Sequence, residues 1–378
     1  MNGTYADLLE VDVAAIEQEL RAFWKSTGES GQEAVMRACS CNLVAVVSNR
    51  KEAAEFPPIV ARVAESHPSR SIIAYVEPEE ATHSSAIRAW ISAQCSPAVS
   101  VTPQVCCESI TLAAQPGAAK DLPNTIVSLL VPDLPVFLYW RSFTAAGRIL
   151  VERIARFSDT LIVDSHRSRQ DPQNRLNLLQ LLIAQPEKTT VRDLNWSRIT
   201  AWRDLIAQFF DPPDARKHLD LISTIEITRQ LSAPGSIPTR TLLLTGWLAS
   251  SLGWRRTSAR RRGDQWFSSW STAGGEVKVT FTGTEARPGE TPGISRIAIR
   301  TRGGEAKFVV SAEPDSFRLN ATTAIEDCRI SHSVAQDPLD EASLLIRELS
   351  HSGRDVVFVP ALREALELEK SFREDTQG

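Results

Sequence analysis

Hydrophobic and polar residues follow two different periods along the first half of the chain, and these periods predict strands separated by helices. Largely apolar runs at 41–48, 70–77 and 136–140 have the length and composition of strands that are buried on both faces. Between the first two runs, Pro57-Pro58 opens the periodic stretch IVARVAE, and proline suits the first turn of a helix. A strand, a helix and a second strand in this order predict a βαβ unit and a parallel sheet.

Further elements of the first half follow from the same periods. Val13, Ile16, Leu20 and Trp24 recur at helical spacing, and Asp12 stands where an N-cap is expected. The other expected strands lie near 87–93, 105–112 and 160–165, and the other expected helices cover 122–130, 149–157 and 172–184.

The second half has a different pattern. Helical periods at 197–210 and 238–252 flank a strand-like run at 221–230, and glycine pairs at 274–275 and 303–304 separate alternating segments, as in β-hairpins. The length of 378 residues favours two domains. We therefore predict an α/β domain over 1–190, with a mostly parallel, Rossmann-like sheet and flanking helices. An α+β domain with antiparallel hairpins follows over 191–378.

The longest apolar stretch, 125–140, is not expected to cross a membrane. It has 16 residues and is broken by Pro132, Asp133 and Pro135, whereas a span needs about 20 apolar residues. The first twelve residues are polar and acidic, without the basic and apolar regions of a signal peptide. We expect a cytoplasmic protein without membrane contact.

Charge gives little sign of a nucleic-acid partner. The net charge of −4 provides no general attraction to nucleic acid. The run RRTSARRR at 255–262 holds five arginines, and we interpret it as a solvated loop, so no nucleic-acid partner is expected. A nucleic-acid module remains a third possibility, and it predicts salt-sensitive retention of DNA or RNA.

The six cysteines show none of the paired spacings of a zinc site. Structural disulfides are not expected in a reducing cytosol, and we favour small core side chains over redox or ligand roles. The six cysteines are Cys39, Cys41, Cys95, Cys106, Cys107 and Cys328.

Catalytic motifs are not found. The sequence holds no GxGxxG after a strand, no GxxxxGK[ST] and no HExxH. Asp164, Ser165 and His166 are triad residue types, but immediate neighbours point to alternate sides of an extended chain and cannot form a triad among themselves. We predict no catalytic residue, no metal ligand and no cofactor.

Two groups of polar residues are candidates for binding a ligand or a partner. His67, Ser69 and Arg70 lie in a loop before a strand, where an arginine fork can hold a carboxylate or phosphate. An ordinary loop with a surface arginine explains them equally well.

The second group lies at the carboxyl ends of predicted parallel strands, the edge at which open α/β sheets place ligand crevices. It consists of Trp140, Arg141, Asp164 and Ser165. Capping of the next helix is an equally good explanation for Ser165.

Several unusual segments between residues 39 and 254 resemble one known family. The chain is similar there to the glucose-6-phosphate dehydrogenase assembly protein (OpcA) family, and the similarity is weaker after Gly253. The segments that carry it are CSCNLVAVVS, HPSR, VPDLPVFLYWR, DLNWSRITAWRDLIAQFFD and TGWLASSLGW.

The resemblance implies a non-catalytic partner that binds glucose-6-phosphate dehydrogenase and raises its activity or promotes its active oligomer, within the oxidative pentose phosphate pathway. The alternative is an enzyme or sensor that binds a sugar phosphate in the crevice of the first domain, with Arg70, Arg141 and Ser165 as ligands.

Overall fold

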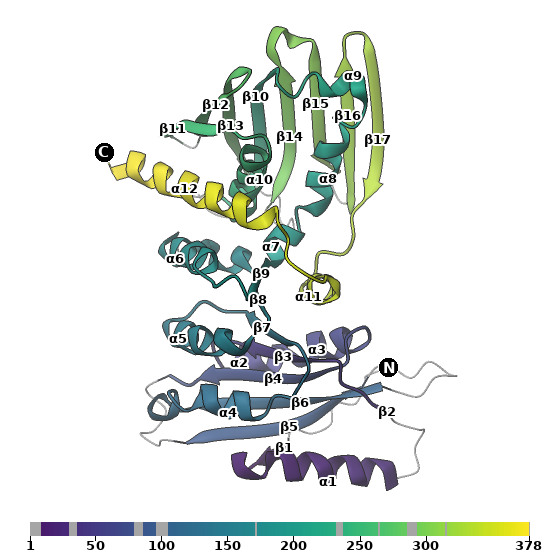
Figure 1. Ribbon diagram of the computed structural model, residues 1–378, viewed down its shortest axis with the longest axis vertical. Coiled ribbons are helices and arrows are strands. Elements are labelled where there is room, and N and C mark those ends of the chain that lie inside the picture. Colours follow the sequence, from purple (N-terminus) through teal and green to yellow (C-terminus); the bar gives the residue numbers. More distant parts are fainter. Residues whose placement is uncertain are drawn as a thin grey trace. The chain divides into compact units, whose positions relative to one another are not determined.

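The computed structural model describes residues 9–29, 36–78, 86–95, 105–170, 172–231, 237–263, 265–285, 293–313 and 316–377 (Figure 1). They divide into two compact units. Unit 1 takes its described residues from Met1–Arg167, Gln185–Leu194 and Asp340–Arg354. Unit 2 takes them from Ser168–Ala184, Asn195–Leu339 and Asp355–Gly378. The predicted domain boundary between residues 190 and 191 stays a prediction.

Unit 1 contains a nine-stranded, mostly parallel sheet, as the apolar runs predict. The strand order is β1-β5-β6-β4-β3-β7-β8-β9, with β2 paired to β6. β3 pairs in parallel with both β4 and β7, while β5 pairs antiparallel with β1 and β6. The strands are β1 (Leu9–Val11), β2 (Met36–Arg37), β3 (Cys41–Val46), β4 (Ser69–Val76), β5 (Ile87–Cys95), β6 (Val105–Ala114), β7 (Val136–Trp140), β8 (Thr160–Val163) and β9 (Thr190–Asp193).

Several helices of unit 1 begin at a side chain that caps them. The Asp12 side chain accepts a hydrogen bond from the Ala14 amide at 2.9 Å, which confirms the predicted cap. Thr144 caps α5, so this helix starts four residues earlier than the predicted Ile149. The helices are η1 (Val13–Ala15), α1 (Ile16–Glu29), α2 (Arg50–Glu55), α3 (Pro57–Ala64), η2 (Pro116–Ala118), α4 (Leu122–Ser128), α5 (Ala145–Ile154), η3 (Ala155–Phe157) and α11 (Glu341–Ser350).

Unit 2 contains a mostly antiparallel sheet of eight strands, which confirms the predicted fold class. The order is β11-β12-β13-β10-β14-β15-β16-β17, and among the pairs of this unit's described strands β10 and β13 alone run parallel. The strands are β10 (Ile222–Leu231), β11 (Arg255–Arg262), β12 (Gln265–Thr272), β13 (Gly275–Glu285), β14 (Ile294–Thr301), β15 (Ala306–Ala312), β16 (Arg318–Ile325) and β17 (Cys328–Ala335).

The hairpin predicted at Gly303-Gly304 is confirmed, and the loop predicted at 255–262 is wrong. Both glycines have positive φ, 75° and 76°, in the turn η5 (Arg302–Gly304) between β14 and β15. The arginine run forms β11, an edge strand paired with β12. Arg261 lies over the Trp266 ring at 4.9 Å, and charged side chains on an edge strand discourage pairing with other chains.

The long helix α12 packs against α10 in unit 2. Gly246 permits this close approach, because a Cβ there would collide with the backbone of Ala361. The helices that lie within this unit are α6 (Pro172–Ile183), α8 (Thr200–Gln208), α9 (Pro213–Arg216), α10 (Thr239–Ser251) and α12 (Phe358–Gln377); α7 (Leu194–Ser197) and η4 (Ser165–Gln170) each span a unit boundary.

The cysteine expectation is correct in part. Cys41 and Cys107 are buried thiols, and burial raises the pKa of Cys41 to about 12 and that of Cys107 to about 11. Cys106 is disulfide-bonded, which contradicts the expectation of no structural disulfide. The physical reason lies in the strand register, which sets Cys106 of β6 opposite Cys95 of β5, an arrangement that reasoning from the cellular compartment does not address.

Candidate functional site

The carboxyl edge of the unit 1 sheet is where a ligand crevice is expected. β3 lies at the centre of the sheet, with β4 on one side and β7 on the other, so the strand order reverses between β3 and β7. Open α/β sheets bind ligands outside the carboxyl ends of the strands at such a switch point.

A carboxylate of the chain itself occupies this position. Arg141, the residue after β7, donates from Nε and Nη2 to the two carboxylate oxygens of Glu341 at 2.7 and 3.0 Å. The Tyr139 hydroxyl donates to Glu341 Oε1 at 2.8 Å, and Arg167 Nη2 donates to Oε2 at 2.9 Å. Glu341 is the first residue of α11. It fills the position that the anionic group of a ligand would take between these donors.

A second carboxylate lies beside the first. Glu52 of α2 accepts hydrogen bonds from the Ser48 amide at 3.0 Å and from the Ser142 hydroxyl. We call Tyr139, Arg141, Arg167, Ser142, Glu52 and Glu341 the Glu341 cluster.

Ionisation in the Glu341 cluster follows from its contacts. Burial alone would raise the pKa of Glu341, but the hydrogen bond from Arg141 and the charge of Arg167 outweigh burial and lower it. Burial likewise opposes ionisation of Glu52, and the hydrogen bonds from Ser142 and Ser48 lower its pKa. Burial, followed by the Glu341 charge, holds the pKa of Tyr139 well above its usual value, so its hydroxyl remains a donor. The carboxylates of the cluster are thus held ionised by its donors, while Arg141 Nη1 is buried without a hydrogen bond, 3.9 Å from Glu55.

The predicted residues Ser69 and Arg70 lie at the other edge of the sheet. Arg70 pairs in register with Asn42 near the start of β3, whereas Trp140 pairs with Val46 at its end. Arg70 Nε donates to Glu108 at 2.8 Å, and both side chains are buried. Grouping Arg70 with Arg141 and Ser165 in one crevice is therefore wrong. β4 and β7 run parallel, and Arg70 lies near the amino end of β4, whereas Arg141 follows the carboxyl end of β7.

Of the other predicted residues, Asp164 lies near the Glu341 cluster. Its Oδ2 is 3.9 Å from Arg167 Nε. Ser165 is buried and its amide donates to Asp193 at 3.0 Å, while the Trp140 ring lies against Phe143 with centroids 4.8 Å apart. His67 is half-buried and hydrogen-bonds the Ser350 hydroxyl at 2.9 Å.

Six of the seven predicted residues are buried, and His67 alone is half-buried. Direct contact with a partner protein through the six would need them to move. Their role in binding a ligand or a partner stays a prediction.

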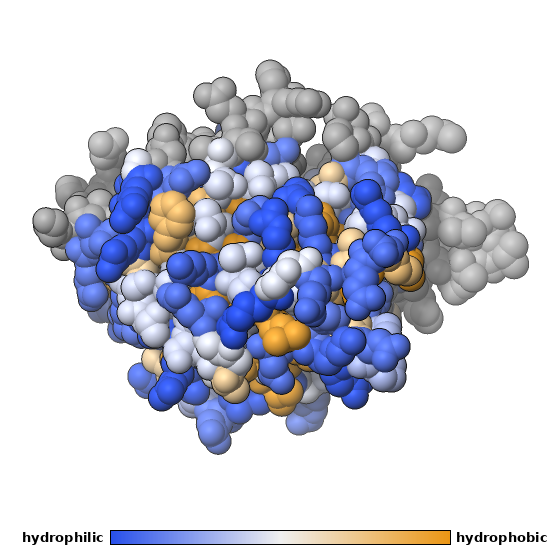
Figure 2. All heavy atoms as spheres, turned by 90° about the horizontal axis from the view of Figure 1, so that it is seen from above, coloured by the Kyte–Doolittle hydropathy of each residue, from blue (hydrophilic) through white to orange (hydrophobic). Residues whose placement is uncertain are grey.

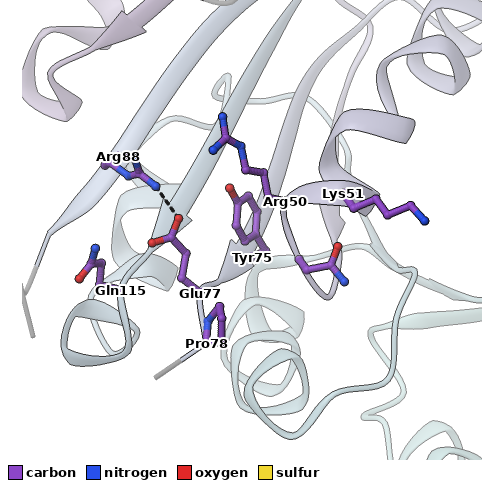
Figure 3. Close-up of a pocket in the computed structure, with 8 residues that line it drawn as sticks. Arg50, Lys51, Tyr75, Glu77, Pro78, Arg88 and Gln115 are labelled. Carbon is purple, nitrogen blue, oxygen red and sulfur yellow. Dashed lines mark hydrogen bonds and ion pairs between the residues drawn. The ribbon is translucent and has the colours of Figure 1, made fainter. Parts of the chain in front are cut away.

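The same edge of the sheet also holds an open cavity of about 600 Å³, which the sequence prediction missed (Figure 3). Its residues lie at or after the carboxyl ends of β3, β4 and β6, with one contribution from β5. Arg141 was predicted because it follows the carboxyl end of a parallel strand. The same criterion, applied to β3, β4 and β6, would have identified the residues of this cavity. We call this cavity the cationic pocket; its lining residues are Asn49, Arg50, Lys51, Tyr75, Glu77, Pro78, Arg88 and Gln115.

Comparison with protein families decides the relationship. A family model for the N-terminal domain of a glucose-6-phosphate dehydrogenase subunit matches residues 60–181, and one for the C-terminal domain matches 189–362. The chain belongs to the OpcA family. The family that the sequence segments indicated is therefore confirmed.

Curated relatives of the chain include proteins named OpcA. That of Synechocystis, named as an OxPP cycle protein, is 27% identical over 317 residues, which cover 78% of this chain and 62% of the relative. That of Synechococcus elongatus is 28% identical over 270 residues, covering 68% and 58%. The chain thus spans less than two thirds of the length of these OpcA relatives.

Solved structures resemble this OpcA family member only loosely. The ketoreductase KijD10 of Actinomadura kijaniata and the aldose-aldose oxidoreductase of Caulobacter crescentus both match with a TM-score of 0.46, at 9% and 11% identity. The matches cover 88% and 89% of this chain, and 97% and 98% of those chains. Such similarity carries no argument about activity. No helix among the described residues is long and apolar enough to span a membrane.

Proposed function

We propose that the chain is a non-catalytic partner of glucose-6-phosphate dehydrogenase, which assembles with the enzyme in the cytoplasm and favours its active state. The observation that carries this proposal is the match of two dehydrogenase-subunit family models, one after the other, over residues 60–181 and 189–362. The names of the curated relatives support a place in the OxPP cycle.

The Glu341 cluster supports a non-catalytic role. A nucleotide phosphate or another anionic substrate at the switch point would have to displace Glu341 from two arginines and a tyrosine. It would also meet the negative charge of Glu52, and like charges at short distance repel. Binding there is therefore unfavourable in this conformation.

Activation needs a difference in affinity between two states of the dehydrogenase. A partner that binds both states with equal affinity does not change the equilibrium between them, however tightly it binds. A coupling free energy of about 1 to 3 kcal/mol corresponds to a 5- to 150-fold effect. Such a difference is within reach of a few contacts at a protein interface.

The alternative function is an enzyme or sensor for a sugar phosphate. The enzyme reading loses support because Arg70 lies at the opposite sheet edge from Arg141 and Ser165. For the nucleic-acid possibility, the backbone amide of Arg261 in β11 donates to Asp375 of α12 at 2.7 Å, which places a carboxylate next to the arginine run. The absence of a nucleic-acid partner stays a prediction.

Assembly is tested with the dehydrogenase of the same organism. The two purified proteins, alone and mixed, are separated by size exclusion with light scattering, and we expect a complex whose mass contains both chains. Serum albumin at the same concentration controls for nonspecific association. Separate elution of the two chains at micromolar concentrations contradicts the proposal.

The face drawn in Figure 2 is mostly hydrophilic, with hydrophobic residues in small groups among polar ones. A contact through this face would resemble a non-obligate interface, which is about as polar as the rest of a protein surface. Such a complex depends on salt, so the separation is repeated at low and high ionic strength.

A further inference from the structure

The cationic pocket differs from the Glu341 cluster because not all of its cations are paired with residues that the structure describes. Three cations and one carboxylate line it among the described residues. Glu77 pairs with Arg88 at 2.5 Å. Arg50 is exposed and makes no hydrogen bond or ion pair with any described residue, so the described lining of the pocket keeps a positive excess.

The side chains of Arg50, Arg88, Glu77 and Tyr75 lie close together in the pocket, while the Lys51 amine points away from them (Figure 3). Figure 3 shows the Arg50 and Arg88 side chains on either side of the Glu77 carboxylate, with the Tyr75 hydroxyl below Arg50 and Gln115 at the far side. Glu77 and the Trp90 ring, 5.2 Å from the guanidinium carbon, hold Arg88 in place. Burial, followed by the charge of Glu77, raises the pKa of Tyr75, so its hydroxyl remains a donor at neutral pH.

We infer that the cationic pocket binds a small phosphate monoester. A phosphate monoester carries a charge of about −1.5 to −2 at neutral pH, which matches the positive excess of the lining. Guanidinium groups match phosphate oxygens in geometry, and the Tyr75 hydroxyl adds a neutral donor. The amides of Asn49 and Gln115 suit the hydroxyl or ring nitrogen atoms of the organic part. The volume of about 600 Å³ lies within the usual range for small-molecule sites.

Sugar phosphates and nucleotides share this chemistry, and titration calorimetry on the full chain separates them. The probes are inorganic phosphate, glucose 6-phosphate and adenosine monophosphate, with glucose and adenosine as matched probes without phosphate. We expect one phosphate ester to bind more tightly than inorganic phosphate, and the probes without phosphate to give no heat. Its affinity falls with added salt, because the attraction is electrostatic.

Arg50→Gln is the decisive variant, because this exposed side chain has no hydrogen bond or ion pair with the part of the chain that the structure describes. We expect about tenfold weaker binding or more, the usual effect of losing a hydrogen bond between charged groups. Arg156→Gln is the matched control: Arg156 is an exposed arginine of unit 1 outside the pocket, and binding should stay within about twofold of wild type. Tyr75→Phe, which keeps the ring, should weaken binding by a smaller factor.

Two results would overturn the inference. One is the absence of binding by every phosphate probe up to about 10 mM, a concentration that reveals even weak sites. The other is equal affinity of wild type and Arg50→Gln for the best probe. Neither result bears on the dehydrogenase, because the measurement uses the isolated chain.

Discussion

The Glu341 cluster and the cationic pocket lie on the same edge of one sheet, yet their arginines have opposite roles. Arg141 is buried and its guanidinium is held by Glu341, a carboxylate 200 positions away in the chain. Arg50 is exposed and has no ion pair among the described residues. The comparison teaches that a position at the carboxyl edge does not make an arginine available to a ligand. What decides is whether the chain supplies its own carboxylate.

Removing Glu341 should have the largest effect on stability. Glu341→Ala leaves Arg141 buried without its main partner and also deprives Arg167 and Tyr139 of an acceptor. We expect the free energy of unfolding to fall by about 3 to 5 kcal/mol, as when one partner of a buried ion pair is removed. Urea unfolding followed by circular dichroism measures the change.

The matched control is Glu152→Ala. Glu152 pairs with Arg148 at 2.8 Å, and about half of each side chain is exposed, so its loss should cost at most about 0.5 kcal/mol. If both variants unfold at the same urea concentration, the Glu341 cluster is not the buried network described above.

A smaller effect is expected from the tyrosine of each region. Tyr139→Phe removes one hydrogen bond to the Glu341 carboxylate and should cost about 1.5 kcal/mol. Tyr75→Phe removes a hydroxyl without a hydrogen-bond partner among the described residues, so its free energy of unfolding should match wild type. Equal losses in the two variants would mean that the regions do not differ as the contacts indicate.

The pH dependence of stability should follow Glu341 and Glu52. Because folding lowers the pKa of both, their stabilising contribution is complete above the ordinary carboxyl pKa and is lost as pH falls through the lowered values. Wild type should therefore lose stability to acid between about pH 5 and pH 3, and Glu341→Gln should lose less over that interval. Parallel curves of urea midpoint against pH would contradict this assignment.

Arg50→Gln should have the smallest effect on stability. Arg50 is exposed and has no ion pair with a described residue, and replacing such a surface side chain changes the free energy of unfolding by at most about 0.5 kcal/mol. A larger loss in thermal unfolding would show that Arg50 supports the fold, and the comparison with Arg141 would fail.

Sequence patterns predicted the frame of the fold well. The apolar runs that became β3, β4 and β7 identify strands buried on both faces, and the glycine pair at 303–304 identifies a hairpin, because both signals are local. β11 was missed because five arginines resemble a solvated loop, while its pairing with β12 depends on tertiary structure.

The candidate site was less predictable, because its contacts also depend on tertiary structure. Arg141 could be placed at the sheet edge from the strand before it, but nothing local links it to Glu341, which lies at the start of a helix far along the chain. Arg70 carries the same side chain and meets Glu108 at the other edge. Which carboxylate reaches which arginine is a property of the folded chain.

The most direct test of the central claim is the rate of the dehydrogenase as the chain is added. With glucose 6-phosphate and NADP present, we expect NADPH formation to rise and saturate at a fixed molar ratio of chain to enzyme, and the chain alone to form none. An unchanged rate at saturating chain, or turnover by the chain alone, would contradict the account.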